Sequence, residues 1–212
     1  MHQTFLHYFS YTPIANIYRQ KTCKNCFFLL LLLAFFTINA NAEEISTENN
    51  TIGGDFELTS HLNQPYSLVN SRGKVVILFF GFTHCPDVCP STLGSVQTAL
   101  SQLGTEADKV DTLMITVDPK RDSPKILEEY MEYFHSSFIG LTGELSKIDE
   151  VVKKYNGFYS YSKNETSYDV DHTSNLYLID PQGEVANIIP YGLPASIISE
   201  NIKKLLPASD AS

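Results

Sequence analysis

The chain has 212 residues, of which 43% are hydrophobic and 18% are charged, and its formal net charge is −9. This is a globular composition with enough apolar material for one ordinary core. Residues 1–42 contain three basic and no acidic side chains, so the remainder carries 12 basic and 24 acidic residues. Such an acidic body repels phosphate backbones, and we expect no nucleic acid among its partners.

Residues 1–42 have the organisation of a signal peptide. Lys21 and Lys24 precede an apolar run over residues 27–38, and Ala40-Asn41-Ala42 supplies the small-x-small pattern that signal peptidase accepts. The run is about half of the roughly 20 residues that span a bilayer. We therefore predict cleavage after Ala42 and export, most simply to the periplasm. The alternative is an uncleaved leader that associates with the inner membrane through the N-terminus.

Behind the leader, hydrophobic periodicity and turn residues divide the chain into alternating strands and helices. In chain order we first predict a polar, flexible tether over 43–54, a hairpin from 56–58 and 66–69, a buried strand over 74–81 and a helix over 90–103. A strand over 111–118, a helix over 124–134 that begins at Ser123-Pro124, a short strand over 138–142 and a helix over 144–155 follow. The chain then forms a hairpin from 175–180 and 184–189, a helix over 195–206 and a tail over 207–212. This alternation predicts an α/β domain over residues 55–206, with a mixed central sheet, flanking helices and an N-terminal hairpin extension.

Two cysteines mark the junction between the buried strand and the helix that follows it. Cys85 and Cys89 lie in the segment Gly-Phe-Thr-His-Cys-Pro-Asp-Val-Cys-Pro of residues 81–90. A helix N-terminus favours thiolate over thiol, and a spacing of four places both sulfurs on one side of a turn. The pair is therefore close enough to share a metal ion or to form a small disulfide. Structural zinc usually needs four protein ligands, whereas two thiolates and one imidazole suit Cu(I).

Four histidines follow the leader, and they differ as candidates for a third ligand. His61 lies in a polar turn and His135 at the end of a helix, so both are expected at the surface. His84 adjoins Cys85, but strand alternation directs its ring away from the sulfur side. His172 lies in a polar loop that precedes the last hairpin. In a sheet of this order, that loop lies at the same end as Cys85, so His172 could approach the thiols.

Three segments together resemble the Sco/SenC family: residues 81–90, residues 117–124 with the sequence Val-Asp-Pro-Lys-Arg-Asp-Ser-Pro, and residues 170–173 with the sequence Val-Asp-His-Thr. The resemblance covers roughly residues 52–206. It implies a thioredoxin-like fold and a copper-binding assembly factor for the Cu(A) centre of cytochrome c oxidase.

Carried over by position, the resemblance implies Cys85, Cys89 and His172 as ligands of copper, as Cu(I) or Cu(II). It also implies that the two cysteines are redox-active and can form a reversible disulfide. Asp171, beside the ligand histidine, is the candidate partner for the other ring nitrogen. Asp118 and Asp122 fit equally well as strand-end and helix-cap residues. The expected partners are the oxidase subunit that carries Cu(A), or another copper acceptor, and a copper donor of unknown identity.

Three other functions remain open at this point. The strongest is a thiol-disulfide oxidoreductase that acts on cysteines of an exported protein, since the same fold hosts CxxC enzymes. Against it, the spacing here is CxxxC, the chain has no Trp, and His172-Thr173 stands where thioredoxins place a cis-proline. A peroxiredoxin-like peroxidase ranks lower, because Thr83 is two residues before Cys85 rather than three. A copper store or sensor without transfer partners is the remaining class.

Overall fold

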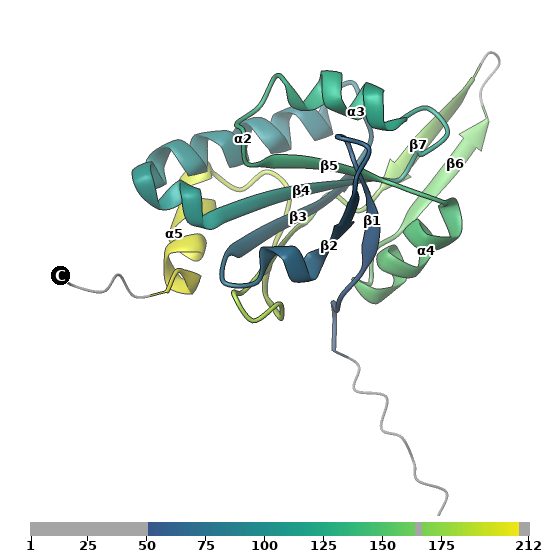
Figure 1. The fold of residues 1–212 in the computed structure, drawn as a ribbon. Helices are drawn as coiled ribbons and strands as arrows, with labels where there is room; N and C mark the ends of the chain where they lie inside the picture. The colour runs from purple at the N-terminus through teal and green to yellow at the C-terminus, as the bar shows by residue number, and fades with distance from the viewer. Residues whose placement is uncertain (1–50, 164–166, 208–212) are drawn as a thin grey trace, which may run out of the picture. The chain divides into compact units, whose positions relative to one another are not determined.

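The computed structural model describes residues 51–163 and 167–207 (Figure 1). The predicted signal peptide, its cleavage site at Ala42, residues 43–50 of the predicted tether and residues 208–212 of the predicted tail lie outside this part. The end of the tether contacts the body, because the Gly53 amide donates to the Lys154 carbonyl at 2.8 Å and Ile52 packs against the core. Within the described ranges, no helix is both long and apolar enough to cross a membrane.

A seven-stranded mixed sheet forms the centre of the domain, as predicted. Its strands in spatial order are β2 (Pro65–Ser67), β1 (Glu57–Ser60), β5 (Phe138–Thr142), β4 (Val110–Thr116), β3 (Val75–Gly81), β8 (Leu176–Ile179) and β9 (Val185–Ile189). The central strands β3, β4 and β5 run parallel, whereas β8 is antiparallel to β3, and β1 is antiparallel to β5. The hairpin of β1 and β2 therefore extends the sheet on one side, and the hairpin of β8 and β9 closes it on the other.

Among the residues that the structure describes, four helices accompany the sheet: α2 (Val88–Leu103), α3 (Pro124–Met131), α4 (Leu145–Lys154) and α5 (Ala195–Leu205), with short 3₁₀ segments at Leu68–Ser71 and Gly104–Lys109. Figure 1 shows α2 and α3 along one face of the sheet and α4 beside β1. The predicted start of α3 is confirmed, because the Ser123 hydroxyl accepts from the Ile126 amide and Pro124 is the first helical residue. Helix α2 begins two residues before the predicted start at Pro90, which places Cys89 in its first turn.

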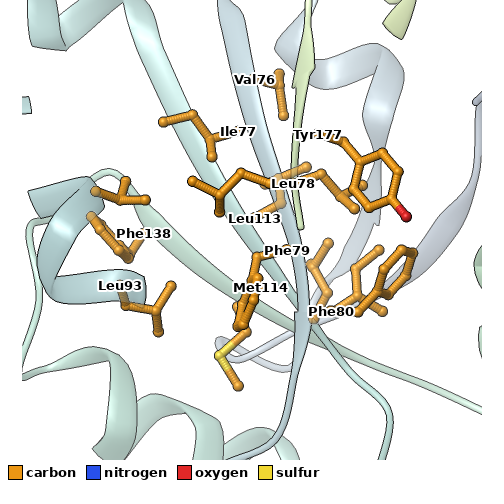
Figure 2. Close-up of a cluster of buried hydrophobic side chains, with 14 of the residues drawn as sticks. Val76, Ile77, Leu78, Phe79, Phe80, Leu93, Leu113, Met114, Phe138 and Tyr177 are labelled. Carbon is orange, nitrogen blue, oxygen red and sulfur yellow. The ribbon is translucent and has the colours of Figure 1, made fainter. Parts of the chain in front are cut away.

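The core fixes the end of β3, from which the cysteine segment departs. Every residue of β3 is buried, as expected for a strand covered on both faces. Figure 2 shows side chains of β3 beside those of β4, α2 and β8. The labelled members are Val76, Ile77, Leu78, Phe79, Phe80, Leu93, Leu113, Met114, Phe138 and Tyr177. Burial of each large apolar side chain stabilises the fold by about 1.5–3 kcal/mol, so the strand is a rigid base for the residues that follow it.

A second, two-stranded sheet was not predicted. Strands β6 (Tyr159–Lys163) and β7 (Tyr168–His172) pair antiparallel, with Tyr159 opposite His172. The expectation that His172 lies in a polar loop was therefore wrong, since it is the last residue of a strand. The physical reason is a ladder of aromatic rings: Tyr161 packs edge-on against both Tyr159 and Tyr168, with ring centroids about 5.5 Å apart.

Candidate metal centre

The segment between β3 and α2 is held in place by the buried carboxyl group of Asp122. Its Oδ2 accepts from the Thr83 amide at 3.0 Å and from the Thr116 hydroxyl at 2.6 Å, and its Oδ1 accepts from the Thr83 hydroxyl at 2.6 Å. Asp122 is fully buried, and Ser123 caps α3. The helix-cap role considered for Asp122 was therefore wrong: its side chain fixes the turn that carries Cys85.

The two cysteines differ in their environments. Cys89 is fully buried in the first turn of α2, whereas Cys85 is half-buried, and both are free thiols. The Cys89 amide donates to the Cys85 sulfur at 3.4 Å. Burial raises the pKa of the Cys89 thiol and outweighs a backbone hydrogen bond that lowers it. The expectation that the helix N-terminus favours thiolate at both positions is thus wrong for Cys89, because removal from water costs the charged form more.

His172 lies against the thiols with a defined tautomer. Its Nε2 is 3.4 Å from the Cys89 sulfur, and its Nδ1 is 3.0 Å from the Thr173 carbonyl oxygen. Because a carbonyl can only accept, Nδ1 carries the hydrogen and the lone pair of Nε2 faces the cysteines. Burial lowers the pKa of the His172 imidazole below 6.5. The ring is therefore neutral at pH 7, which is the form that binds metals.

The predicted hydrogen bond between Asp171 and His172 is absent from this site. Neighbouring residues of a strand point to opposite faces, so Asp171 is exposed while the His172 ring turns inward. The second ring nitrogen is paired with a backbone carbonyl instead. Two aromatic rings complete the surroundings, since Phe79 and Phe82 meet the imidazole edge-on at centroid distances of 5.8 and 5.7 Å.

The structure brings Cys85, Cys89 and His172 together. One ligand atom from each lies within 4.8 Å of the others, although 83 residues separate Cys89 from His172. A spread of this size allows one small ion to contact all three after minor side-chain movement. Two sulfurs and one imidazole nitrogen are soft ligands, which suit Cu(I) better than they suit magnesium or calcium.

The other three histidines that the structure describes lie outside this group. His84 is exposed, and its Nδ1 is 3.1 Å from the Thr83 hydroxyl. His135 is at the surface, as expected, where its Nδ1 accepts from the Ser137 amide. His61 differs from the expectation of a surface residue, because it is half-buried and accepts from the Gly140 amide at 3.1 Å.

Comparison with known proteins supports the resemblance seen in the sequence. The chain matches the family described as SCO1/SenC over residues 44–207. It is a member of the SCO1/SenC family. An SCO2-like protein of Rickettsia felis is 37% identical to this Sco chain over 162 residues, which cover 74% of the chain and 79% of that protein. Mitochondrial SCO2 of Saccharomyces cerevisiae is 41% identical over 137 residues, which cover 63% of the chain. The chain spans about half of that yeast relative, 46% of its length.

A solved structure gives the same fold. The copper-bound structure of ScoI from Bradyrhizobium japonicum superposes with a TM-score of 0.68 at 33% identity and covers 73% of this Sco chain and 99% of that one. The predicted thioredoxin-like fold is confirmed by this match. The β6–β7 hairpin is the part of the candidate site that the sequence did not predict, and Asp122 and Asp171 are the residues whose roles were predicted wrongly. Alternation of Tyr with Ser over residues 159–162 was the available signal for the hairpin.

Proposed function

We propose that this protein is a copper chaperone that binds one copper ion through Cys85, Cys89 and His172 and delivers it to the Cu(A) site of cytochrome c oxidase. The observation that carries the proposal is the convergence of these three side chains within 4.8 Å. Membership of the SCO1/SenC family and the likeness to a ScoI structure with copper bound support it. The protein mainly serves as a metallochaperone, and copper is its cargo.

The unequal exposure of the cysteines suggests an order for copper transfer. Cys85 is the accessible sulfur, so a thiol of the acceptor displaces it first, while Cys89 and His172 still hold the ion. The remaining ligands exchange one at a time, so copper is never free. No electrons move: the acceptor's thiols release protons as they bind the ion, and the two cysteines here take up protons as they lose it. The raised pKa of Cys89 favours its reprotonation.

The second candidate function is a thiol-disulfide oxidoreductase. The observation that favours it is the same pairing of a half-exposed thiol with a buried one, because an exposed thiol can attack a disulfide and a buried neighbour can resolve the mixed disulfide. Oxidation of Cys85 and Cys89 to a disulfide also removes both sulfur ligands and ejects copper. Copper binding therefore depends on the redox state of the compartment.

The proposed setting follows from the chain's organisation. Residues 1–42 direct export to the periplasm, 43–54 link the leader to the body, and 55–206 form the copper-binding domain. If the leader stays uncleaved, it tethers the domain to the inner membrane. The acceptor is the oxidase subunit that carries Cu(A), or another protein with soft ligands.

Replacing His172 by alanine separates the two candidate functions. For the reduced full chain, we expect His172→Ala to weaken Cu(I) binding by more than about 100-fold, since even residues that only orient a ligand are typically worth about 10- to 100-fold. Formation of the Cys85–Cys89 disulfide should be unaffected. Competition with a Cu(I) chelator and thiol titration measure the two properties.

The matched control is His135→Ala, which removes an exposed imidazole that contacts Ser137 and lies outside the group of three ligands. This variant should bind copper as the parent does. If His172→Ala holds copper as tightly as the parent and loses only disulfide reductase activity, the oxidoreductase function replaces the chaperone.

A further inference from the structure

The strand that carries His172 does not belong to the central sheet. In the described part of the chain, β7 pairs only with β6, whereas Cys85 follows β3 and Cys89 lies in the first turn of α2. In Figure 1 this hairpin lies past the right-hand ends of the central strands, apart from the seven-stranded sheet. The C-terminal end of β7 lies near β3 through the backbone, because β8 begins at Leu176 and pairs with β3, with Leu176 opposite Phe79. This pairing does not extend to β6 and β7, so side chains must fix the rest of the hairpin to the body.

Three residues supply that attachment, and we call them the hairpin clamp: Asp118, Arg121 and Tyr168. Asp118 follows β4, is fully buried and forms an ion pair with Arg121. The Arg121 guanidinium lies over the Tyr168 ring at 4.1 Å and donates to the Tyr168 carbonyl at 3.4 Å. The Tyr168 hydroxyl donates to Asp118 at 2.8 Å. The three side chains thus form a closed ring of contacts between the body and β7.

The contacts of Arg121 continue toward the imidazole. Its guanidinium lies 5.6 Å from the Phe82 ring, and the Phe82 ring meets the His172 ring at 90°. A neighbouring contact strengthens the attachment, since the Tyr161 hydroxyl of β6 donates to the Val117 carbonyl at 2.6 Å. Tyr168 and His172 are four residues apart on one strand, so they share a face of β7. A change in the position of the Tyr168 side chain therefore moves the end of β7 that carries the imidazole.

One feature of the Arg121 side chain does not favour the stability of the fold. Its Nη2 is buried and has no hydrogen-bond partner in the described residues. Leaving a buried polar group unpaired costs free energy. The arrangement instead places the guanidinium over the Tyr168 ring, a contact for which lysine is not an equivalent replacement. Burial and the hydrogen bond to Asp118 raise the pKa of Tyr168 to about 12, so its hydroxyl remains a donor at neutral pH.

We infer that the hairpin clamp sets the position of His172 against Cys85 and Cys89, which makes Arg121 a positioning residue for the copper ligand. The inference rests on the proposed function, because it concerns the ligand set of the same site. It assigns a role to the motif over residues 117–124, whose charged residues lie outside the group of Cys85, Cys89 and His172. The competing account is that the clamp only stabilises the domain.

A double-mutant cycle distinguishes these accounts. The full chain carries Arg121→Gln alone, His172→Ala alone, or both, and Cu(I) affinity is measured by chelator competition under reducing conditions. We expect Arg121→Gln to weaken binding by about 10-fold in the parent, as for other residues that orient a ligand, and to change nothing once His172 is absent. An equal loss in both backgrounds, or no loss in either, overturns the inference.

The matched control is Arg72→Gln, which breaks an exposed ion pair with Asp55. It should leave copper affinity unchanged. A parent chain that binds no copper overturns the proposed function, whereas a parent that binds copper and an Arg121→Gln variant that binds it equally well overturn only the clamp.

Hydrogen exchange of the copper-free protein provides a second readout. In Arg121→Gln, the amides of β6 and β7 should exchange at least about 10-fold faster, while those of β3 and β4 keep the parent rates. Tyr168→Phe, which keeps the ring and removes the hydroxyl, should show the same pattern to a smaller degree. Faster exchange throughout the domain would mean that the clamp is a general stabiliser, and would overturn the inference.

Discussion

Replacing Cys89 by serine is expected to weaken Cu(I) binding by about a thousandfold or more, which corresponds to ~4 kcal/mol. The hydroxyl group is a hard, neutral ligand and cannot replace a soft thiolate. The Cys89 sulfur also lies 3.4 Å from Nε2 of His172, so its loss removes the ligand that is in contact with the imidazole. Chelator competition on the reduced full chain measures the change.

The chain contains its own cysteine control. Cys23 and Cys26 lie in the predicted leader, and replacing both by serine should leave the affinity and the one-to-one stoichiometry unchanged. Circular dichroism should show that Cys89→Ser keeps its fold. Tight, stoichiometric copper binding by folded Cys89→Ser would contradict the proposed site.

Replacing Asp122 by alanine is expected to reduce both the stability of the domain and its copper affinity. The carboxyl group accepts three hydrogen bonds, from the Thr83 amide, the Thr83 hydroxyl and the Thr116 hydroxyl. Each buried donor left without a partner costs about 1–3 kcal/mol, so we expect a loss of about 3 kcal/mol or more in the free energy of unfolding. The turn that presents Cys85 also loses its anchor, which should weaken copper binding about 10-fold. Urea unfolding and chelator competition measure the two effects.

Asp111 provides a matched control near the start of β4, the strand whose other end carries Thr116, a hydrogen-bond partner of Asp122. It is also nearly buried and accepts from the Ser71 hydroxyl at 2.7 Å and from Lys74 at 2.8 Å, far along β4 from the cysteines. We expect Asp111→Ala to destabilise the domain without changing its copper affinity once it is folded. If the two alanine variants lower stability alike and neither alters copper affinity, Asp122 does not organise the site.

Sequence patterns predicted the elements that have strong periodicity. The apolar run of β3, the Ser-Pro start of α3 and the spacing of the last hairpin each have a local cause, so they could be predicted without tertiary contacts. Strands β6 and β7 were not predicted because their Ser and Asp residues give them a loop-like composition, despite the alternating tyrosines. They form because tyrosines from both strands pack edge to face, which is a cross-strand property.

The residue types that can bind a metal could be predicted from the sequence, whereas the contacts that hold them in place could not. The two close cysteines follow from residue type and spacing, whereas the expected order of the sheet made His172 a candidate and the family resemblance implied it as the third ligand. The partner of His172 could not be predicted, because a carbonyl acceptor exists at every residue and strand alternation directs Asp171 away. The contact of Arg121 with Tyr168 joins residues 47 apart in sequence, and neither residue type indicates the other.

X-ray absorption spectroscopy of the reduced full chain loaded with one equivalent of Cu(I), beside His172→Ala, tests most directly whether the imidazole and both thiols hold one ion. We predict two sulfur atoms and one imidazole nitrogen around each copper in the parent, and loss of the nitrogen in the variant. Identical spectra from parent and variant, or a parent spectrum with sulfur ligands alone, would contradict the three-residue site.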